Sequence, residues 1–453
     1  MRRRIFLETM LTLLLIVMIN SAFHVGIVSA SSTIYIRADG SVDPPTAPIQ
    51  RVGNTYTFTA NINEPIIIEK SNIIVDGNNY KVQGTGTGYG ILLNGTITAL
   101  INVTMKNMYI TGFNYGIYMT LSTNCQIDGN GLAYNQLGGV WIGQCTQISI
   151  TNNAMTNNYA GVLLTWSNST ITVANNSMRS NPIGVMLIVS GNNIIRDNTI
   201  AYSNIGGIYL DRSDNNLIYH NNLLSNNPQG VAPESTSTWD NGYPSGGNYW
   251  SDYTGVDANH DGIGDTAYVI DENNTDRYPL MNIQGTHDVA VTNMTMSKTV
   301  IGQGYPANIT VTLQNKGSLT EIFNATVAAN FTIVQTVQVY LKSGQLTTIT
   351  FVWNTTGRTK GTYRIYTQAD RVAGETDANA SDNSLTYGMV KVTVPGDVDG
   401  DRDIDIYDIV KIASAYSSGL GNPRFDPNCD IDSNNIINIY DVVIATSRYG
   451  YTE

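Results

Sequence analysis

A glycine followed by a short apolar run returns along the chain at intervals of 22–23 residues. The glycines are Gly116, Gly139, Gly161, Gly184, Gly207 and Gly230. Asparagines recur in phase with them, each with an apolar residue two positions later, at Asn130, Asn153, Asn176, Asn198 and Asn222. A fixed period of this length is typical of stacked identical units, in which each unit buries its apolar side chains against its neighbours.

Each repeat unit contains two or three short runs of β-forming residues, for example 147–151 and 169–173. Clusters of Asn, Ser and Gly, which favour turns, separate these runs, and residues 60–235 contain no sustained helical period. The pattern predicts a mainly β protein in which residues 31–238 form a right-handed parallel β-helix of about 22–23 residues per coil. We expect the asparagines to stack as an internal ladder, with sugar binding by their amides as the alternative.

The repeat region resembles the NosD-like family of right-handed β-helix proteins over roughly residues 60–285. This resemblance implies a secreted, carbohydrate-associated protein. NosD itself is linked to copper-site assembly, but the residues do not support that role here. After the amino-terminal segment only His220, His260 and His287 remain, and there is no Met-X-Met or Cys-His cluster.

The repeat stops near Trp239, and residues 239–285 are rich in aromatic and loop-forming residues. An open end of a β-helix exposes strand edges and core, so this segment is predicted to cap the helix. Its aromatic side chains, among them Trp239 and Trp250, form a platform for stacking sugars in the alternative interpretation.

Residues 286–395 alternate between apolar and polar positions, most clearly at 288–292, 307–313 and 347–353. Turn-forming strings that contain Gly separate these runs, so about seven short strands are predicted in an antiparallel β-sandwich. The strings 351–357 and 374–377 resemble the CARDB family of immunoglobulin-like adhesion modules. That resemblance implies a spacer or binding module.

Two twelve-residue segments near the end of the chain carry oxygen-bearing side chains at loop positions 1, 3, 5, 9 and 12. These residues are Asp397, Asp399, Asp401, Asp405 and Asp408 in the first loop, and Asp430, Asp432, Asn434, Asn438 and Asp441 in the second. Ca²⁺ takes about six to eight oxygen ligands, and such a loop adds the carbonyl at position 7, here Asp403 or Ile436. The sequence therefore predicts Ca²⁺ as a bound cofactor.

Each loop continues through a repeated Ile-Tyr-Asp string into an amphipathic segment, 409–416 or 442–449. This duplicated arrangement is similar to the type I dockerin module. The resemblance implies that residues 396–453 form a small α-helical calcium module that binds a cohesin-type domain of another protein. It also implies contact with that partner, in either of two orientations, through Ile406, Tyr407, Ile439 and Tyr440. The alternative is that these four side chains only pack the module's own core.

Position 6 of both loops departs from the dockerin pattern, because Arg402 and Asn435 replace the usual glycine. Asparagine tolerates the left-handed conformation, whereas placing arginine in that conformation would cost about 1–2 kcal/mol. A third candidate loop keeps this glycine and comprises Asp257, Asn259, Asp261, Ile263 and Asp265. Its position 12 is Tyr268, so the closing acid would come from elsewhere, for example Asp271, and we expect a structural calcium ion in the cap.

The composition limits the classes of function. The chain has a formal net charge of −12 and no basic patch, which argues against nucleic acid as a partner. Three cysteines, Cys125, Cys145 and Cys429, are too few for a disulfide framework, and a bridge between the first two is not favoured.

Residues 1–30 have the pattern of a secretory signal peptide, with three arginines at 2–4, an apolar stretch at 11–19 and small residues at 28–30. A retained membrane anchor is the alternative. After cleavage no membrane span remains, so we expect a secreted protein that is extracellular or held at the cell surface.

Polysaccharide-cleaving β-helix enzymes need acids, or an acid and a basic group, clustered on one face. The one candidate cluster in residues 100–235 is Asp211 and Arg212 with Asp214 and, one strand later, His220, while Arg196-Asp197 lies on the previous coil. A solvated turn with local ion pairs is the favoured interpretation. The sequence thus favours a non-catalytic, calcium-dependent protein that binds a polysaccharide or a surface glycan, and the alternative is a lyase or glycoside hydrolase carried by the same tail.

Overall fold

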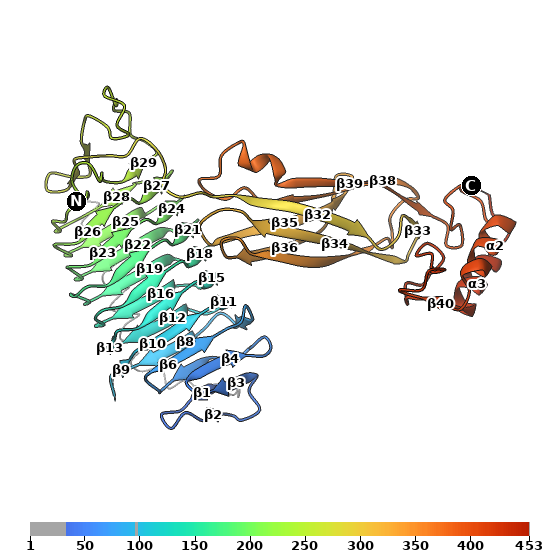
Figure 1. The fold of residues 1–453 in the computed structure, drawn as a ribbon, viewed down its shortest axis with the longest axis horizontal. Helices are drawn as coiled ribbons and strands as arrows, with labels where there is room; N and C mark the ends of the chain where they lie inside the picture. The colour runs from blue at the N-terminus through green and yellow to red at the C-terminus, as the bar shows by residue number, and fades with distance from the viewer. Residues whose placement is uncertain (1–32, 96–97, 453) are drawn as a thin grey trace.

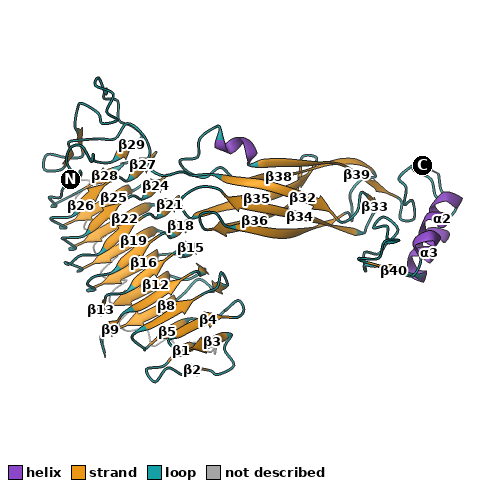
Figure 2. Cartoon of the chain, in the orientation of Figure 1, coloured by secondary structure: helices purple, strands orange, loops and turns teal. Residues whose placement is uncertain are grey.

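The computed structural model describes residues 33–95 and 98–452, and the signal peptide predicted for residues 1–30 lies outside them. A long parallel β-solenoid comes first, an arm of two mostly antiparallel sheets projects sideways from it, and a small module with two helices lies at the far end of the arm (Figure 1). Strands dominate the regular structure of the described residues (Figure 2), so the prediction of a mainly β protein is confirmed.

The solenoid is built from three sheets, which we name A, B and C. Sheet A contains, in spatial order, β2 (Val42–Asp43), β1 (Ile34–Ile36), β5 (Ile66–Ile68), β8 (Tyr89–Asn94), β12 (Tyr115–Thr120), β16 (Gly138–Gly143), β19 (Ala160–Thr165), β22 (Ile183–Ile188), β25 (Gly206–Asp211) and β28 (Gly230–Val231). Sheet B contains β26 (Leu217–Tyr219), β23 (Ile194–Arg196), β20 (Thr172–Ala174), β17 (Ser149–Thr151), β14 (Gln126–Asp128), β10 (Val103–Lys106), β6 (Ile73–Asp76), β4 (Thr55–Phe58) and β3 (Ile49–Val52). Sheet C contains β29 (Tyr249–Trp250), β27 (Asn222–Leu224), β24 (Thr199–Ala201), β21 (Ser177–Arg179), β18 (Ala154–Thr156), β15 (Gly131–Ala133), β11 (Tyr109–Thr111) and β7 (Lys81–Gln83). Two short pairs, β9 (Leu100–Ile101) with β13 (Ser122–Thr123) and β30 (Tyr268–Val269) with β31 (Thr275–Asp276), complete this part.

Successive coils approach so closely that the repeating glycines are required. A Cβ atom added to Gly184 would lie 2.5 Å from the carbonyl oxygen of Gly207 and 2.3 Å from Cγ2 of Ile200. The equivalent atom would lie 2.5–2.8 Å from a carbonyl oxygen of the next coil at Gly116, Gly139, Gly161 and Gly207. Any larger residue would push the coils apart, which explains why glycine recurs at this position of each repeat.

The predicted asparagine ladder is present inside the solenoid. Asn130, Asn153, Asn176 and Asn198 are buried, and the backbone N–H and Nδ2 of each of the first three donate to Oδ1 of the next at 2.9–3.0 Å. The fifth member was predicted wrongly, because Asn198 donates to Asn221 and not to Asn222. Asn222 instead begins β27 and donates to Thr199. Since the ladder amides are buried, they are not available to a sugar.

Further buried ladders were not predicted from the sequence. A second asparagine ladder joins Asn135, Asn158 and Asn181 in the same way. A serine ladder accepts backbone N–H groups of the preceding coil at 2.9–3.3 Å, through Ser167, Ser190, Ser213 and Ser235. These ladders satisfy the polar backbone groups at the corners of the coils, where strands end.

Residues 239–285 lie over the last coil of the solenoid. Trp239 and Trp250 are 0% and 1% exposed and belong to the solenoid core, so these two rings do not form a platform for sugars. The segment also extends the solenoid, because β29 pairs with β27 and Asn248 accepts from Asn221. The carboxylate of Asp276 ends the ladder, where it accepts from the backbone N–H of Asn248 at 2.7 Å.

The arm consists of a three-stranded and a five-stranded sheet. The first contains β32 (Val289–Met296), β34 (Pro306–Asn315) and β37 (Leu346–Asn354), and the second contains β33 (Val300–Gly302), β39 (Ser384–Thr393), β38 (Gly361–Ala369), β35 (Glu321–Ala329) and β36 (Thr332–Leu341). A short 3-10 helix, η1 (Asn379–Asp382), precedes β39. Alternate residues of both sheets, such as Ile309 and Phe351 from one and Val327 and Val390 from the other, form one buried cluster. The expected strand alternation at 288–292, 307–313 and 347–353 corresponds to β32, β34 and β37.

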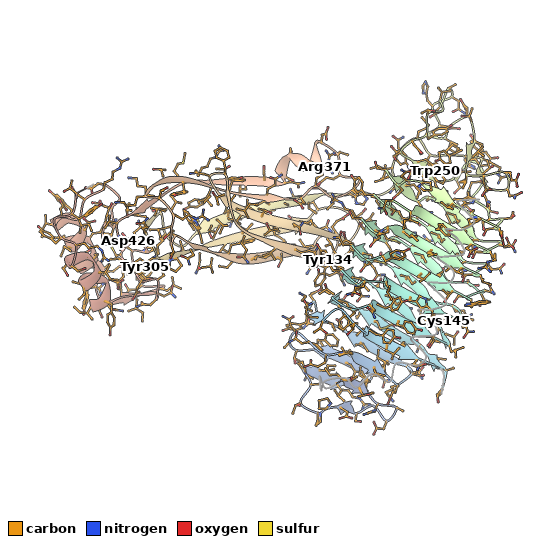
Figure 3. The ribbon with its side chains drawn as sticks, turned by 180° about the vertical axis from the view of Figure 1, so that it is seen from behind. Tyr134, Cys145, Trp250, Tyr305, Arg371 and Asp426 are labelled. Carbon is orange, nitrogen blue, oxygen red and sulfur yellow. The ribbon has the colours of Figure 1, made fainter. Side chains whose placement is uncertain are left out.

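The arm is fixed to the side of sheet C by a buried polar contact. His287 Nδ1 lies 2.5 Å from Glu321 Oε1, its Nε2 lies 2.9 Å from Thr199 Oγ1, and the side chains of His287 and Glu321 are 0% and 3% exposed. Around this pair, Ile322 packs against Ala133 and Ala154 of the solenoid. Figure 3 shows Tyr134 and Arg371 on either side of this junction. A junction that buries both apolar and paired polar groups holds the two parts in a defined orientation.

The carboxy-terminal module contains α2 (Ile406–Ala415), α3 (Ile439–Thr446) and the short pair β40 (Ser418–Gly419) and β41 (Ile436–Ile437). Its core is a separate buried cluster that includes Ile412, Cys429 and Ala445. Tyr305 of the arm packs against this core, and Figure 3 shows it beside Asp426 at the distal end of the arm. The three cysteines Cys125, Cys145 and Cys429 are buried and unbridged.

Candidate calcium and docking sites

The two candidate calcium loops lead into α2 and α3 with the same local structure. Asp405 and Asn438 are the N-caps of these helices, and each side chain accepts a hydrogen bond from a backbone N–H of the first turn. Asp408 and Asp441 return a bond to the N-cap backbone at 3.0 and 2.9 Å, which completes a capping box. The acid at position 12 is therefore held in place by the beginning of the helix.

The structure gathers the acids of the second loop into one group and those of the first loop into two. Oxygen atoms lie within 4.8 Å of one another in three groups, which are Asp397, Asp399 and Asp401; Asp403, Asp405 and Asp408; and Asp430, Asp432 and Asp441. These are the groups of three or more potential metal-binding acids, histidines or cysteines found in residues 33–95 and 98–452. Closely spaced carboxylate oxygens of this kind suit a hard divalent cation such as Ca²⁺.

Backbone N–H groups orient the first acid of each loop. Asp397 accepts from Gly400 at 2.6 Å and from Arg402 at 3.1 Å, and Asp430 accepts from Asn434 and Asn435 at 3.0 Å. The side chain of Asn434 in turn accepts from the backbone N–H of Ile436 at 2.9 Å. The backbone of each loop thus wraps around the carboxylate at position 1. Asp403 and Ile436, whose carbonyls are the position-7 candidates, belong to these wrapped segments.

The loop acids are held in an environment that disfavours their charge. Burial raises the pKa of Asp397 to about 6, and the N–H groups of Gly400 and Arg402 offset this only in part. Burial also raises the pKa of Asp399, with repulsion from Asp408 as a further cause. Burial raises the pKa of Asp430 as well. A cation among these groups would relieve their repulsion.

Position 6 takes the left-handed conformation in both loops. Arg402 has φ of 88° and Asn435 has φ of 69°. Asparagine adopts this region readily, but the arginine is strained by about 1–2 kcal/mol. The absence of glycine at position 6 therefore corresponds to backbone strain in the first loop.

The four residues predicted to contact a partner are exposed at the start of the two helices. Ile406, Tyr407, Ile439 and Tyr440 are 52%, 71%, 54% and 67% exposed, and they are not members of the module's core cluster. Val410 and Val443, each four residues after one of these isoleucines, are 58% and 53% exposed. We name Ile406, Tyr407 and Val410 the first docking face, and Ile439, Tyr440 and Val443 the second. The valines were not singled out in the sequence, although their helical spacing from the isoleucines was a usable signal.

The third candidate loop is less complete. Asp257 and Asp261 accept N–H bonds from Gly262 and Ile263 at 2.9 Å, as in the other loops. However, among the described residues its acids do not gather within 4.8 Å of one another as those of the other two loops do. Asp265 is bonded to the backbone N–H of Ala258, and Asn259 donates to Asp261. Asp271, considered as the closing acid, bonds to Asn273 and Asn274.

The candidate catalytic residues do not form one cluster. Asp211 and Arg212 pair with each other at 3.0 Å at the end of β25 in sheet A. His220 follows β26 of sheet B and instead lies 3.6 Å from Asp197. The nearby carboxylate of Asp197 raises the pKa of His220. Burial opposes ionisation of Asp197, but its contacts with His220 and Arg196 lower its pKa overall. The sequence placed His220 beside the wrong acid because the register of neighbouring coils was not known.

The solenoid is similar to a known family of proteins. Residues 89–243 match the family described as "right handed beta helix region". This match and the parallel three-sheet topology confirm the prediction of a right-handed β-helix. No curated protein matches the chain significantly.

Several solved structures are similar to parts of the chain. One is the CARDB domain of a Pyrococcus furiosus protein in complex with di-metal ions, which is 24% identical with a TM-score of 0.21, over 24% of this chain and 96% of that one. A second is a domain of a Methanosarcina acetivorans protein assigned provisionally to the cell surface, 23% identical with a TM-score of 0.20, over 24% of this chain and 92% of that one. A third is the β-glucosidase of Listeria innocua, 14% identical with a TM-score of 0.18, over 28% of this chain and 18% of that one.

Within the described ranges, no helix combines the length and the apolar character needed to cross a bilayer.

Proposed function

We propose that this protein is a non-catalytic, extracellular or cell-surface protein that attaches through residues 396–453 to a cohesin-type domain of another protein. In this proposal Ca²⁺ fills the loops that begin at Asp397 and Asp430, and the β-helix is held away from the attachment point by the arm. The observation that carries the proposal is the pair of similar docking faces, whose apolar side chains are more than half exposed.

The docking faces have the composition of a protein-binding surface. Each places a tyrosine, an isoleucine and a valine on the first turns of a helix, and the tyrosines are 71% and 67% exposed. Burying an exposed aliphatic or aromatic side chain stabilises a complex by about 1.5–3 kcal/mol each, before the costs of association are subtracted. Because the two faces carry the same residue types, a partner that fits one also fits the other, which supports binding in two orientations.

Calcium is proposed to fix the orientation of the helices that carry these faces. Residues 396–453 contain 11 acidic and 4 basic residues, a net charge of −7. The acids at position 12, Asp408 and Asp441, belong both to the loops and to the capping boxes of α2 and α3. A cation that neutralises the loop acids therefore stabilises the same residues that set the start of each helix.

The arrangement of the three parts is consistent with a display protein. The arm separates the module from the solenoid (Figure 1), and the buried contact of His287 with Glu321 fixes its base. The ligand of the solenoid is proposed to be a polysaccharide or a surface glycan.

Binding to a panel of immobilised cohesin-type domains would test the proposal. The full chain is expected to bind at least one domain in Ca²⁺ and to be released by EDTA. Alanine at Ile406 and Tyr407, or at Ile439 and Tyr440, should leave binding through the other face, whereas the variant with all four replaced should not bind. Tyr387→Ala, on an exposed aromatic residue of the arm, is the matched control. Binding by the fourfold variant, or the absence of binding to every domain while the loops bind Ca²⁺, would contradict the proposal.

The non-catalytic part of the proposal has its own test. The protein is incubated with plant, microbial and host polysaccharides, and new reducing ends and unsaturated uronates are followed. We expect no release. Release that disappears in Asp211→Ala or His220→Ala would show that the protein is instead a polysaccharide-degrading enzyme.

A further inference from the structure

Two neighbouring hollows rich in basic side chains lie on the arm and where the arm meets the carboxy-terminal module, in a chain with a net charge of −12. Their volumes are roughly 430 and 470 Å³, residues 360–362 line both, and we call the two together the groove. Arg358 and Phe331 line the first part, Lys391 and Arg402 line the second, and Lys360 lines both. Among the described residues, no acidic side chain lines either part. The groove is therefore a local exception to the acidic character of the protein.

Arg402 is the least expected member of this groove. It occupies position 6 of the first loop with φ of 88°, where glycine would remove the strain. Residues held in strained conformations by the surrounding structure cluster at functional sites. Here the strained backbone presents an exposed guanidinium to the groove, beside Lys360 and Lys391.

The two lysines are positioned by the surrounding structure. Lys391 Nζ donates to the carbonyl oxygen of Gly400 at 2.5 Å, and Lys360 Nζ donates to the hydroxyl of Tyr451 at 2.6 Å. Lys360 also lies 5.0 Å from the centre of the Tyr451 ring. Because these contacts restrict the flexible stems, less conformational entropy is lost when an anion binds.

An exposed aromatic ring lies at the other end of the groove. Phe331 is 101% exposed, at the turn between β35 and β36 where Asn330 has φ of 54°. Sugar rings stack on such apolar faces, while arginine and lysine pair with carboxylate and sulfate groups. An aromatic ring followed by a row of cations is suited to a sugar polymer that carries repeated oxyanions.

We propose that this groove binds an anionic polysaccharide. Phe331 stacks on a sugar ring, and Arg358, Lys360, Lys391 and Arg402 pair with acidic groups along the chain. The proposal does not rest on docking to a cohesin-type domain, because none of these residues belongs to a docking face. It places a glycan site on the arm and the adjoining first loop, outside the solenoid.

Occupancy of the first calcium loop should strengthen this binding. Arg402 lies between Asp401 and Asp403 in the sequence, and the negative charge of the loop acids opposes an incoming anion. This additional effect rests on the calcium sites of the proposed function. By thermodynamic linkage, the polysaccharide must then raise the affinity for Ca²⁺ by the same factor.

The test measures binding of the full chain to polygalacturonate, dextran sulfate and uncharged dextran, in Ca²⁺ and at low salt. We expect binding to at least one anionic polymer and none to dextran. The polymer that binds more tightly identifies carboxylate or sulfate as the preferred group. Arg402→Gly should weaken binding about tenfold, the effect of one charged hydrogen bond, without weakening Ca²⁺ binding, because glycine relieves the strain in the loop. Arg402→Gly combined with Phe331→Ala should weaken it further.

Arg424→Gln is the matched control, since Arg424 is an exposed cation of the same module that lines neither part of the groove. It should bind like the unmodified protein. Equal binding to dextran, no binding to either anionic polymer, or unchanged binding by the double variant would overturn the proposal. An equal loss in Arg424→Gln would also overturn it, because binding would then follow net charge alone.

Discussion

Replacing Asn176 with alanine should destabilise the solenoid strongly. Asn176 lies in the middle of the internal ladder and is 0% exposed. Its Nδ2 donates to the carbonyl oxygens of Ile150 at 2.8 Å and Ala174 at 3.0 Å, as well as to the next asparagine. Its Oδ1 accepts the backbone N–H of Asn153 at 2.9 Å. The alanine variant therefore leaves one buried N–H and two buried carbonyl groups without this partner.

The expected size of the effect follows from these lost partners. A buried polar group left unsatisfied costs about 1–3 kcal/mol, so three such groups predict a loss of about 3–9 kcal/mol. That is a large part of the stability of a typical domain, which is about 5–15 kcal/mol. The coils on both sides of Asn176 should then open together, because each coil is stabilised by its neighbours.

Hydrogen exchange measured by mass spectrometry can detect this opening coil by coil, alongside urea unfolding. Asn175→Gly is the matched control, because Asn175 precedes Asn176 in the same corner, has φ of 55° and is partly exposed. Glycine adopts this conformation readily, so the control should lose only a few tenths of a kcal/mol, roughly. The reasoning is refuted if Asn176→Ala exchanges and unfolds like Asn175→Gly.

Three other predictions concern the cap, the coil contacts and the arm. Burial raises the pKa of Asp276 to about 6, so the folded protein binds this proton more tightly than the unfolded chain. The protonated carboxyl group of Asp276 therefore stabilises the fold fully below pH about 3.8, and roughly 3 kcal/mol of the free energy of unfolding is lost as the pH rises through 6. Asp276→Asn should remove this pH-dependent loss from the free energy of unfolding measured against pH. Gly184→Ala should lower the free energy of unfolding by at least about 1–3 kcal/mol, because the added Cβ has no space. Gly206→Ala should be tolerated, because the nearest atom to its added Cβ is 3.5 Å away. Equal thermal unfolding temperatures of the two variants would contradict the close-contact explanation. His287→Ala leaves the buried carboxyl group of Glu321 without this polar partner, so the arm should loosen and broaden the distance distribution in small-angle scattering, while an unchanged distribution would show that the contact is not needed.

The repeat architecture could be predicted because coil contacts act at a fixed sequence interval. The glycines mark positions where a carbonyl oxygen of the next coil leaves no space for a side chain, as at Gly184. The asparagine ladder recurs for a similar reason, since each amide must meet its neighbour one coil away. The serine ladder is harder to recognise, because serine is also common in turns and Cys145 occupies the preceding position.

The exact register between coils could not be predicted. Asn221 and Asn222 are adjacent and of the same type, so spacing alone did not decide which one continues the ladder. The same uncertainty placed His220 with Asp211, although the folded chain places it beside Asp197. A change of one residue in register moves a side chain to another face, so the side chains that meet in a candidate catalytic cluster of such a repeat can be identified only from the three-dimensional structure.

The loop acids were found from the sequence because their ligand spacing is local. Asp430, Asp432 and Asp441 lie within twelve residues, and the helix start at Asn438 fixes the last of them. The arm's attachment had no such signal, because His287 and Thr199 are 88 residues apart. The basic groove was missed for the same reason, since Phe331, Lys360 and Arg402 come from separate segments.

Calorimetric titration of the full chain with Ca²⁺ tests the central claim most directly, because docking is proposed to depend on the two filled loops. The account predicts two sites in residues 396–453, one lost in Asp397→Ala and the other in Asp430→Ala, with Glu272→Gln, an exposed acid of the cap, unchanged. Heat that is unchanged in the Asp397→Ala and Asp430→Ala double variant, or no heat from the unmodified protein, would contradict it.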